Sequence, residues 1–192
     1  MNAPQPTRRQ VLVGGAVALT ATALTGAAAS RASAAPTDPG IDVHVVVVDG
    51  MRPDELTTDL TPTLTRLAAA GTTFTDASAI AIAETLPNHA AMMTGVRPSR
   101  NGVPANVIFD QAEGETRDLD RPTDLWAPTM LDRIRDELGF VTASVLSKEY
   151  LHGLFGTRAS VVWEPAPLMP GTEHAPDIFT MDALIRTVED HA

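Results

Sequence analysis

The feature that most constrains the fold is a valine run at residues 43–48, in which every residue except His44 is β-branched. Continuous runs of this kind are typical of a strand that is buried on both faces of a parallel sheet. Such a sheet needs helices on both of its faces, because each face must be covered. The run therefore predicts an α/β protein.

The rest of the pattern alternates between helical and extended segments, which also favours the α/β class. We predict helices over residues 61–70, 127–138, 148–154 and 177–191, and strands over 72–75, 140–146 and 160–163. Acidic residues in the loop at 110–124 lack the ordered oxygen spacing of a calcium-binding loop, so we expect a solvated loop there.

The valine run ends at Asp49, which is followed by Gly50. An acid at the carboxyl end of a buried strand lies where open α/β sheets bind their ligands. A buried carboxylate is costly unless it is paired or bound to a metal. Asp49 is therefore either a metal ligand or a loop-capping residue, and the apolar run before it favours the ligand.

A second segment, residues 84–95, reads as a loop that turns into a short helix. Pro87 suits the first turn, and Gly95 is placed to end the helix. The start of this helix, at Thr85, would offer free N–H groups and a positive dipole end to a phosphate. Taken alone, the Thr85 hydroxyl is either an N-cap or a nucleophile that a neighbouring group activates.

Residues 1–34 have the pattern of an export signal. Arg8 and Arg9 precede an uncharged run, and Ala32-Ser33-Ala34 forms a small-x-small cleavage site. The segment resembles a twin-arginine signal, which implies the twin-arginine export machinery as a partner and a periplasmic, envelope or extracellular location. An uncleaved membrane anchor is the alternative, but the Ala/Gly-rich composition favours cleavage and no remaining membrane span. Residues 35–40 would be a linker, and 41–192 the folded part.

Composition narrows the partners and the metal chemistry. The net charge of −10 argues against non-specific binding to nucleic acid, because the phosphate backbone is also negative. The chain has no cysteine, which excludes disulfides and thiolate metal sites. Carboxylates, imidazoles and hydroxyls remain as possible metal ligands.

Three features together resemble the type I phosphodiesterase/nucleotide pyrophosphatase family of the alkaline-phosphatase-like superfamily. They are Asp49-Gly50 after the valine run, Thr85-Leu-Pro-Asn-His with Thr94-Gly95 behind it, and Asn106. The resemblance implies a three-layer α/β/α sandwich with a mostly parallel sheet. Residues 41–192 would be its N-terminal portion, with the C-terminal part missing.

The resemblance also implies roles for these residues. Asp49 would be a carboxylate ligand of one of two catalytic divalent metal ions, for which zinc is expected. Thr85 would bind the same metal and act as the nucleophile, and Asn106 would donate to a phosphoryl oxygen. The implied reaction is metal-dependent hydrolysis of a phosphodiester, pyrophosphate or phosphonate bond in a small molecule.

The family's later metal motifs, an Asp-x-x-x-His and an Asp-His pair after a strand, are not found. No histidine has an acid four places before it, and Asp190-His191 lies in a helical pattern. We therefore expect the second metal site to be incomplete, a sheet edge to be exposed, and the chain to be an N-terminal fragment that is inactive or nearly so alone. The alternative is a non-catalytic exported anion-binding module or relic fragment. A sulfatase is disfavoured, because Thr85 stands where sulfatases have Cys or Ser.

Overall fold

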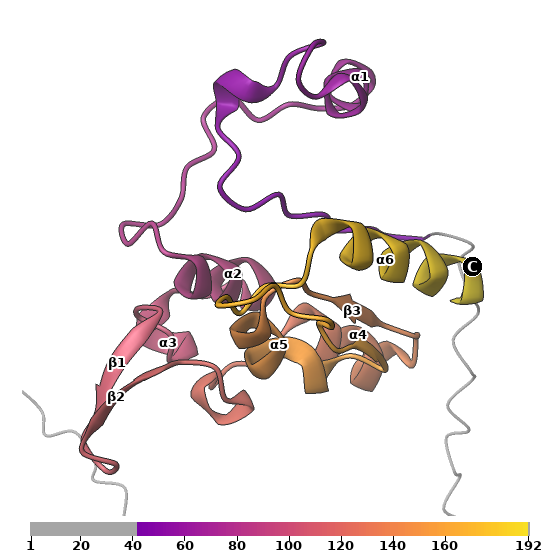
Figure 1. The fold of residues 1–192 in the computed structure, drawn as a ribbon. Coiled ribbons are helices and arrows are strands. Elements are labelled where there is room, and N and C mark those ends of the chain that lie inside the picture. The colour runs from indigo at the N-terminus through magenta and orange to yellow at the C-terminus, as the bar shows by residue number, and fades with distance from the viewer. Residues whose placement is uncertain (1–41, 192) are drawn as a thin grey trace, which may run out of the picture. The chain divides into compact units, whose positions relative to one another are not determined.

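A computed structural model describes residues 42–191 and contains helices and small sheets (Figure 1). In chain order, its elements are α1 (Pro62–Ala70), α2 (Thr85–Thr94), α3 (Pro98–Asn101), β1 (Val107–Asp110), β2 (Glu115–Asp118), α4 (Met130–Leu138), β3 (Ala143–Val145), α5 (Glu149–Phe155), β4 (Val161–Trp163) and α6 (Asp177–His191). Three short 3-10 helices lie at Pro53–Glu55, Pro122–Asp124 and Gly156–Arg158. The predicted signal and linker, residues 1–40, fall outside the described residues.

The described strands form two separate sheets of two strands each. β1 and β2 make an antiparallel hairpin in which Val107 pairs with Asp118. β3 and β4 are parallel, with Ala143 opposite Val161, and α5 lies between them in the chain as in a βαβ unit. The mixed α/β class is thus confirmed, whereas the predicted single, mostly parallel sheet with its three layers is not formed by residues 42–191.

The valine run at 43–48 is the clearest difference from the sequence prediction. It forms no strand, and its valines are exposed, with Val43 at 79%. β-branched residues fit a pleated sheet surface, but a strand also needs a neighbour for its backbone hydrogen bonds. No described strand pairs with this run, so the prediction of a buried strand was wrong for these residues. The strand predicted at 72–75 is absent from this part of the chain for the same reason.

The helix predictions are largely confirmed. α6 has the predicted bounds, and α1 and α5 begin one residue later than predicted. α4 begins at Met130 rather than at residue 127, because Thr129 caps it: the Thr129 hydroxyl accepts from the Asp132 N–H, and the Asp132 carboxylate accepts from the Thr129 N–H. Gly139 ends α4 in the left-handed conformation, as the sequence indicated.

The hydrophobic core lies between α2, α5 and the loops around the hairpin. Its buried members are Leu86, Ala90, Val103, Leu119, Leu125, Leu151, Leu154 and Phe155. Because Leu86 and Ala90 are fully buried, the first turns of α2 are fixed against this core. The position of Thr85, at the start of the same helix, follows from that packing.

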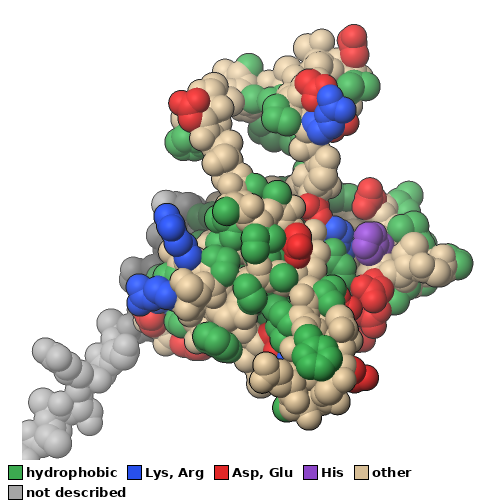
Figure 2. Space-filling model, turned by 90° about the vertical axis from the view of Figure 1, so that its left-hand side faces the viewer, with side chains coloured by type: hydrophobic (Ala, Val, Ile, Leu, Met, Phe, Trp, Pro, Cys, Tyr) green, Lys and Arg blue, Asp and Glu red, His purple; other side chains and the backbone are tan. Residues whose placement is uncertain are grey.

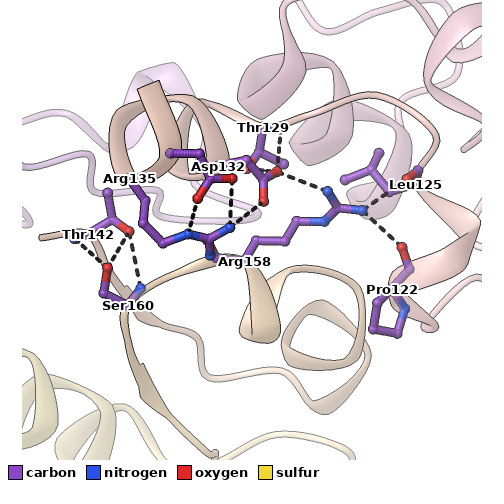
Figure 3. A network of polar contacts seen from close by, with 9 residues as sticks. Pro122, Leu125, Thr129, Asp132, Arg135, Thr142, Arg158 and Ser160 are labelled. Atoms are coloured by element: carbon purple, nitrogen blue, oxygen red, sulfur yellow. Dashed lines mark hydrogen bonds and ion pairs between the residues drawn. The ribbon is translucent and has the colours of Figure 1, made fainter. Parts of the chain in front are cut away.

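A polar network ties the loop at 122–129 to α4 and to the segment before β4 (Figure 3). The Arg158 guanidinium donates to the carbonyl oxygens of Pro122 and Leu125, each at 2.9 Å, and to the Asp132 carboxylate at 2.9 Å. Thr129 donates to the same carboxylate from both its N–H and its hydroxyl. The network supplies hydrogen-bond donors to loop carbonyl oxygens that would otherwise be shielded from water without a partner.

Hydrophobic side chains also reach the surface at several points of the face drawn in Figure 2, where they are scattered among polar and charged ones. Among residues 42–191, no helix combines the length and the apolarity that crossing a bilayer requires.

Candidate active site

The helix that carries the predicted nucleophile begins at Thr85. Glu84 before it is extended, Pro87 lies in the first turn, and Gly95 ends the helix with φ 71° in the left-handed region. Thr85 is therefore the first helical residue and not the N-cap, so the N-cap alternative is wrong. Its hydroxyl is free for another partner.

That partner is the predicted carboxylate. Thr85 Oγ1 donates to Asp49 Oδ2 over 3.3 Å, across 36 positions of sequence. The Asp49 side chain is 37% exposed, so it is not the buried carboxylate that the valine run suggested. The structure brings the two predicted metal ligands together without the buried strand from which Asp49 was inferred.

Lys148 is a site residue that the sequence analysis missed. It lies between β3 and α5, and its ammonium group pairs with the same Asp49 oxygen, 99 positions away in sequence. Its side chain is 18% exposed, and its Nζ lies 5.7 Å from the centroid of the Tyr150 ring. A lone lysine belongs to no motif, so only its place after a strand could have drawn attention to it.

The pair is charged on both sides at neutral pH. The hydrogen bond from Lys148 lowers the pKa of Asp49 despite the opposing effect of burial. Burial would lower the pKa of Lys148, but the hydrogen bond to Asp49 and the neighbouring Tyr150 side chain outweigh that effect and raise the pKa. Lys148 thus balances the negative charge of Asp49 beside the Thr85 hydroxyl.

Asn106 also lies at the start of α2. Its Oδ1 accepts from the Leu86 N–H at 2.8 Å, and its own backbone N–H donates to Glu84 Oε2 at 2.6 Å. Among residues 42–191, the Asn106 Nδ2 group donates to no acceptor. The amide therefore has an unused donor next to Thr85.

Asn88 and His89, the last two residues of the Thr-Leu-Pro-Asn-His segment, hold the loop around the helix start. Asn88 Oδ1 accepts from the Ile80 N–H, and its Nδ2 donates to the carbonyl oxygens of Ile82 and Glu84. His89 Nδ1 lies 2.8 Å from the Thr85 carbonyl oxygen, which can only accept, so Nδ1 carries the hydrogen. This bond holds the His89 ring against the first turn of α2.

The residues described do not make the expected zinc site. Asp49 and Thr85 supply two oxygen donors, and the Lys148 ammonium occupies one carboxylate oxygen. No cluster of three or more metal-binding side chains exists within residues 42–191. Protein zinc sites use three or four protein ligands, so this donor set is too small for tight binding.

A comparison with known families matches the chain to one of them. The sequence model described as type I phosphodiesterase / nucleotide pyrophosphatase covers residues 43–182. The match spans the valine run, the Thr85 segment, Asn106 and Lys148, and it confirms the resemblance noted from the sequence. It implies an alkaline-phosphatase-like fold and a phosphodiesterase-type hydrolase. The chain therefore belongs to the type I phosphodiesterase/nucleotide pyrophosphatase family.

Proposed function

We propose that this chain carries the nucleophile and the phosphoryl-binding amide of a hydrolase for small phosphodiesters or pyrophosphates, with phosphonates as a further substrate class. The observation that supports it best is the hydrogen bond from Thr85 Oγ1 to Asp49 at the start of α2, with Asn106 anchored beside it. Family membership supports the reaction class.

In this proposal, Thr85 Oγ1 forms a bond to phosphorus while the bond from phosphorus to the leaving oxygen breaks, and the hydroxyl proton passes through solvent to that leaving oxygen. Water then cleaves the phosphothreonine ester and regenerates the hydroxyl. The lowered pKa of Asp49 makes it a weak general base, so its role is to orient the Thr85 hydroxyl. Asn106 Nδ2 donates to a non-bridging phosphoryl oxygen as charge develops there.

Lys148 contributes by charge. An anionic substrate approaching Thr85 would be repelled by an unpaired Asp49 carboxylate, and the Lys148 ammonium cancels that charge. Lys148→Met should therefore raise KM for an anionic diester, whereas Lys148→Arg should retain most of the affinity.

Members of this family are typically metal-dependent, and zinc is the expected ion. A bound divalent cation would lower the pKa of a hydroxyl that coordinates it and would balance the negative charge of the phosphoryl group. Asp49 and Thr85 are the donors that residues 42–191 offer to it, and they need further donors. Titration of residues 35–192 with zinc should show weak binding at most, which Asp49→Asn abolishes.

Hydrolysis of bis(4-nitrophenyl) phosphate by Thr85→Ala and Thr85→Ser variants tests the nucleophile. Thr85→Ala should abolish any turnover, whereas Thr85→Ser keeps a hydroxyl and should retain part of it. Phosphate binding should survive Thr85→Ala. Turnover by Thr85→Ala at the wild-type rate would overturn the proposal. Phosphate binding by a wild-type chain without turnover would favour the second candidate, a non-catalytic anion-binding module.

We also propose export through the twin-arginine pathway, on the basis of Arg8, Arg9 and the Ala32-Ser33-Ala34 site in the sequence. Replacing both arginines by lysine should keep the protein inside the cell with residues 1–34 attached. Unchanged export of that variant would exclude the pathway.

A further inference from the structure

Two hydrogen bonds join Asn106 to the residues on either side of Thr85. The Glu84 carboxylate accepts from the Asn106 backbone N–H at 2.6 Å, and the Asn106 side-chain oxygen accepts from the Leu86 backbone N–H at 2.8 Å. The two bonds run in opposite directions between the same two segments, the start of α2 and the loop before β1. They form a clamp around the nucleophile's position, and we call them the Glu84–Asn106 clamp.

One side of this clamp is rigid. Leu86 is fully buried in the core, and the Glu84 carbonyl oxygen is held by Asn88 Nδ2 at 2.8 Å. On the other side, Asn106 itself is also held by the bond from the Leu119 N–H to the Asn106 carbonyl oxygen at 2.9 Å. The Glu84 carboxylate is thus one of the two groups that tie the Asn106 loop to the rigid helix start, and the Asn106 side-chain oxygen is the other.

The Glu84 side chain has no other structural task in this part of the chain. It makes no capping bond to α2, although Glu84 is the residue before the helix. Among residues 42–191 it forms no ion pair with a lysine or arginine. A charged acceptor bonded to a backbone N–H is stronger than a neutral one, so this single contact is well suited to fix the loop.

We propose that Glu84 is a positioning residue for Asn106. Its carboxylate keeps Asn106 Oδ1 on the Leu86 N–H, which leaves Nδ2 as the free donor beside Thr85. Glu84 touches no reacting atom in this arrangement and acts through Asn106 alone. The catalytic consequence rests on the proposed function, whereas the clamp itself does not.

Amide hydrogen exchange, measured by NMR on the Glu84→Ala and Glu84→Gln variants, tests the clamp directly. In Glu84→Ala, the Asn106 N–H loses its acceptor, and the released loop should also free the Leu86 N–H, so both exchange about ten-fold faster or more. Glu84→Gln keeps an oxygen acceptor and should stay within about three-fold of wild type. Asn106→Ala is the matched control. It removes the acceptor of the Leu86 N–H and should speed exchange there, while residue 84 remains a glutamate.

The exchange at Leu154 in α5 shows whether the core is intact in each variant. Unchanged exchange at Leu86 in Glu84→Ala, with Asn106→Ala speeding it, would overturn the clamp. If the Glu84→Ala protein does not fold, Glu84→Gln and Glu84→Asp provide the test. The shorter Asp side chain should speed amide exchange at Asn106. Equal exchange in wild type, Glu84→Gln and Glu84→Asp would overturn the proposal.

Turnover of bis(4-nitrophenyl) phosphate provides the readout that a purely structural residue would not change. Glu84→Ala should lower kcat about ten-fold with little change in KM, and Glu84→Gln should restore it. Unchanged kcat in an active Glu84→Ala enzyme would overturn the positioning role. If amide exchange is faster in Glu84→Ala as expected, but the wild-type chain shows no turnover, the clamp is established. That result would count against the proposed function instead.

Discussion

Residues 42–84 and residues 85–163 differ in whether their apolar side chains are buried. The first region contains the valine run, the most apolar stretch of the described chain, yet no residue between 42 and 84 is buried. The second region has shorter apolar stretches but forms the whole core cluster, in which Leu154 is 0% exposed. Apolar composition therefore does not decide burial by itself, because a side chain is buried only where other elements supply a surface for it.

The two regions also differ in their polar contacts. In residues 42–84 the ion pair is local, between Arg52 and Asp54. In the second region, Arg158 reaches back 36 positions to Pro122 and 26 positions to Asp132. Long-range polar bonds of this kind connect segments that the core alone does not fix. The contacts of Asp49 with Thr85 and Lys148, and the bond from the Asn106 N–H to Glu84, are the places where the first region makes such long-range contacts.

The largest effect expected from this comparison is on core packing. Leu154→Ala should lower the free energy of unfolding by about 2–5 kcal/mol, because it leaves a cavity in the core. Val46→Ala in the exposed run should change it by less than about 0.5 kcal/mol. Urea unfolding of both variants provides the measurement. A Val46→Ala cost close to that of Leu154→Ala would mean that the run is buried after all, as the sequence pattern predicted.

Breaking the long-range polar network should have the next largest effect. Arg158→Met removes three hydrogen bonds and leaves the Asp132 carboxylate with fewer donors, at a cost of about 2–3 kcal/mol of unfolding free energy. Arg52→Met is the matched control in the first region and should cost less than about 0.5 kcal/mol, since its ion pair is exposed. Equal costs for the two variants in urea unfolding would remove the distinction between the regions.

The same network predicts an acid-sensitive stability. Burial would raise the pKa of Asp132, but hydrogen bonds from the Thr129 N–H and from Arg158 outweigh it and hold the pKa below the ordinary value of 3.8. The unfolded chain thus binds the proton more readily, so this contribution is present above about pH 4 and is lost as the pH falls below it. Between pH 5 and pH 3, the free energy of unfolding should depend less on pH in Asp132→Asn than in the wild type. An unchanged slope would contradict this role of Asp132.

The smallest effect should come from the Asp49–Lys148 ion pair, which is one of the links between the two regions. The Asp49 side chain is 37% exposed, so its ion pair with Lys148 should contribute about 1 kcal/mol or less and should weaken in salt. A double-mutant cycle with Asp49→Asn and Lys148→Met, at low and high salt, measures that coupling. A coupling well above this value that salt does not change would place the pair in a buried environment, unlike the rest of residues 42–84.

The sequence by itself determined the local features and the family. Glycine at 95 and 139 ended helices as predicted, α6 had its predicted bounds, and the Thr85 segment with Asp49 and Asn106 identified the family. Capping, turn and periodicity signals act within a few residues, so they can be read without knowledge of distant partners.

Only the tertiary structure decided which distant residues meet. Lys148 reaches Asp49 across 99 positions, and Glu84 reaches the Asn106 N–H across 22. The same dependence explains the failed strand at 43–48, because a strand requires a partner whose presence no local pattern can indicate. Burial and pairing are properties of two segments at once, whereas the signals in a sequence belong to one.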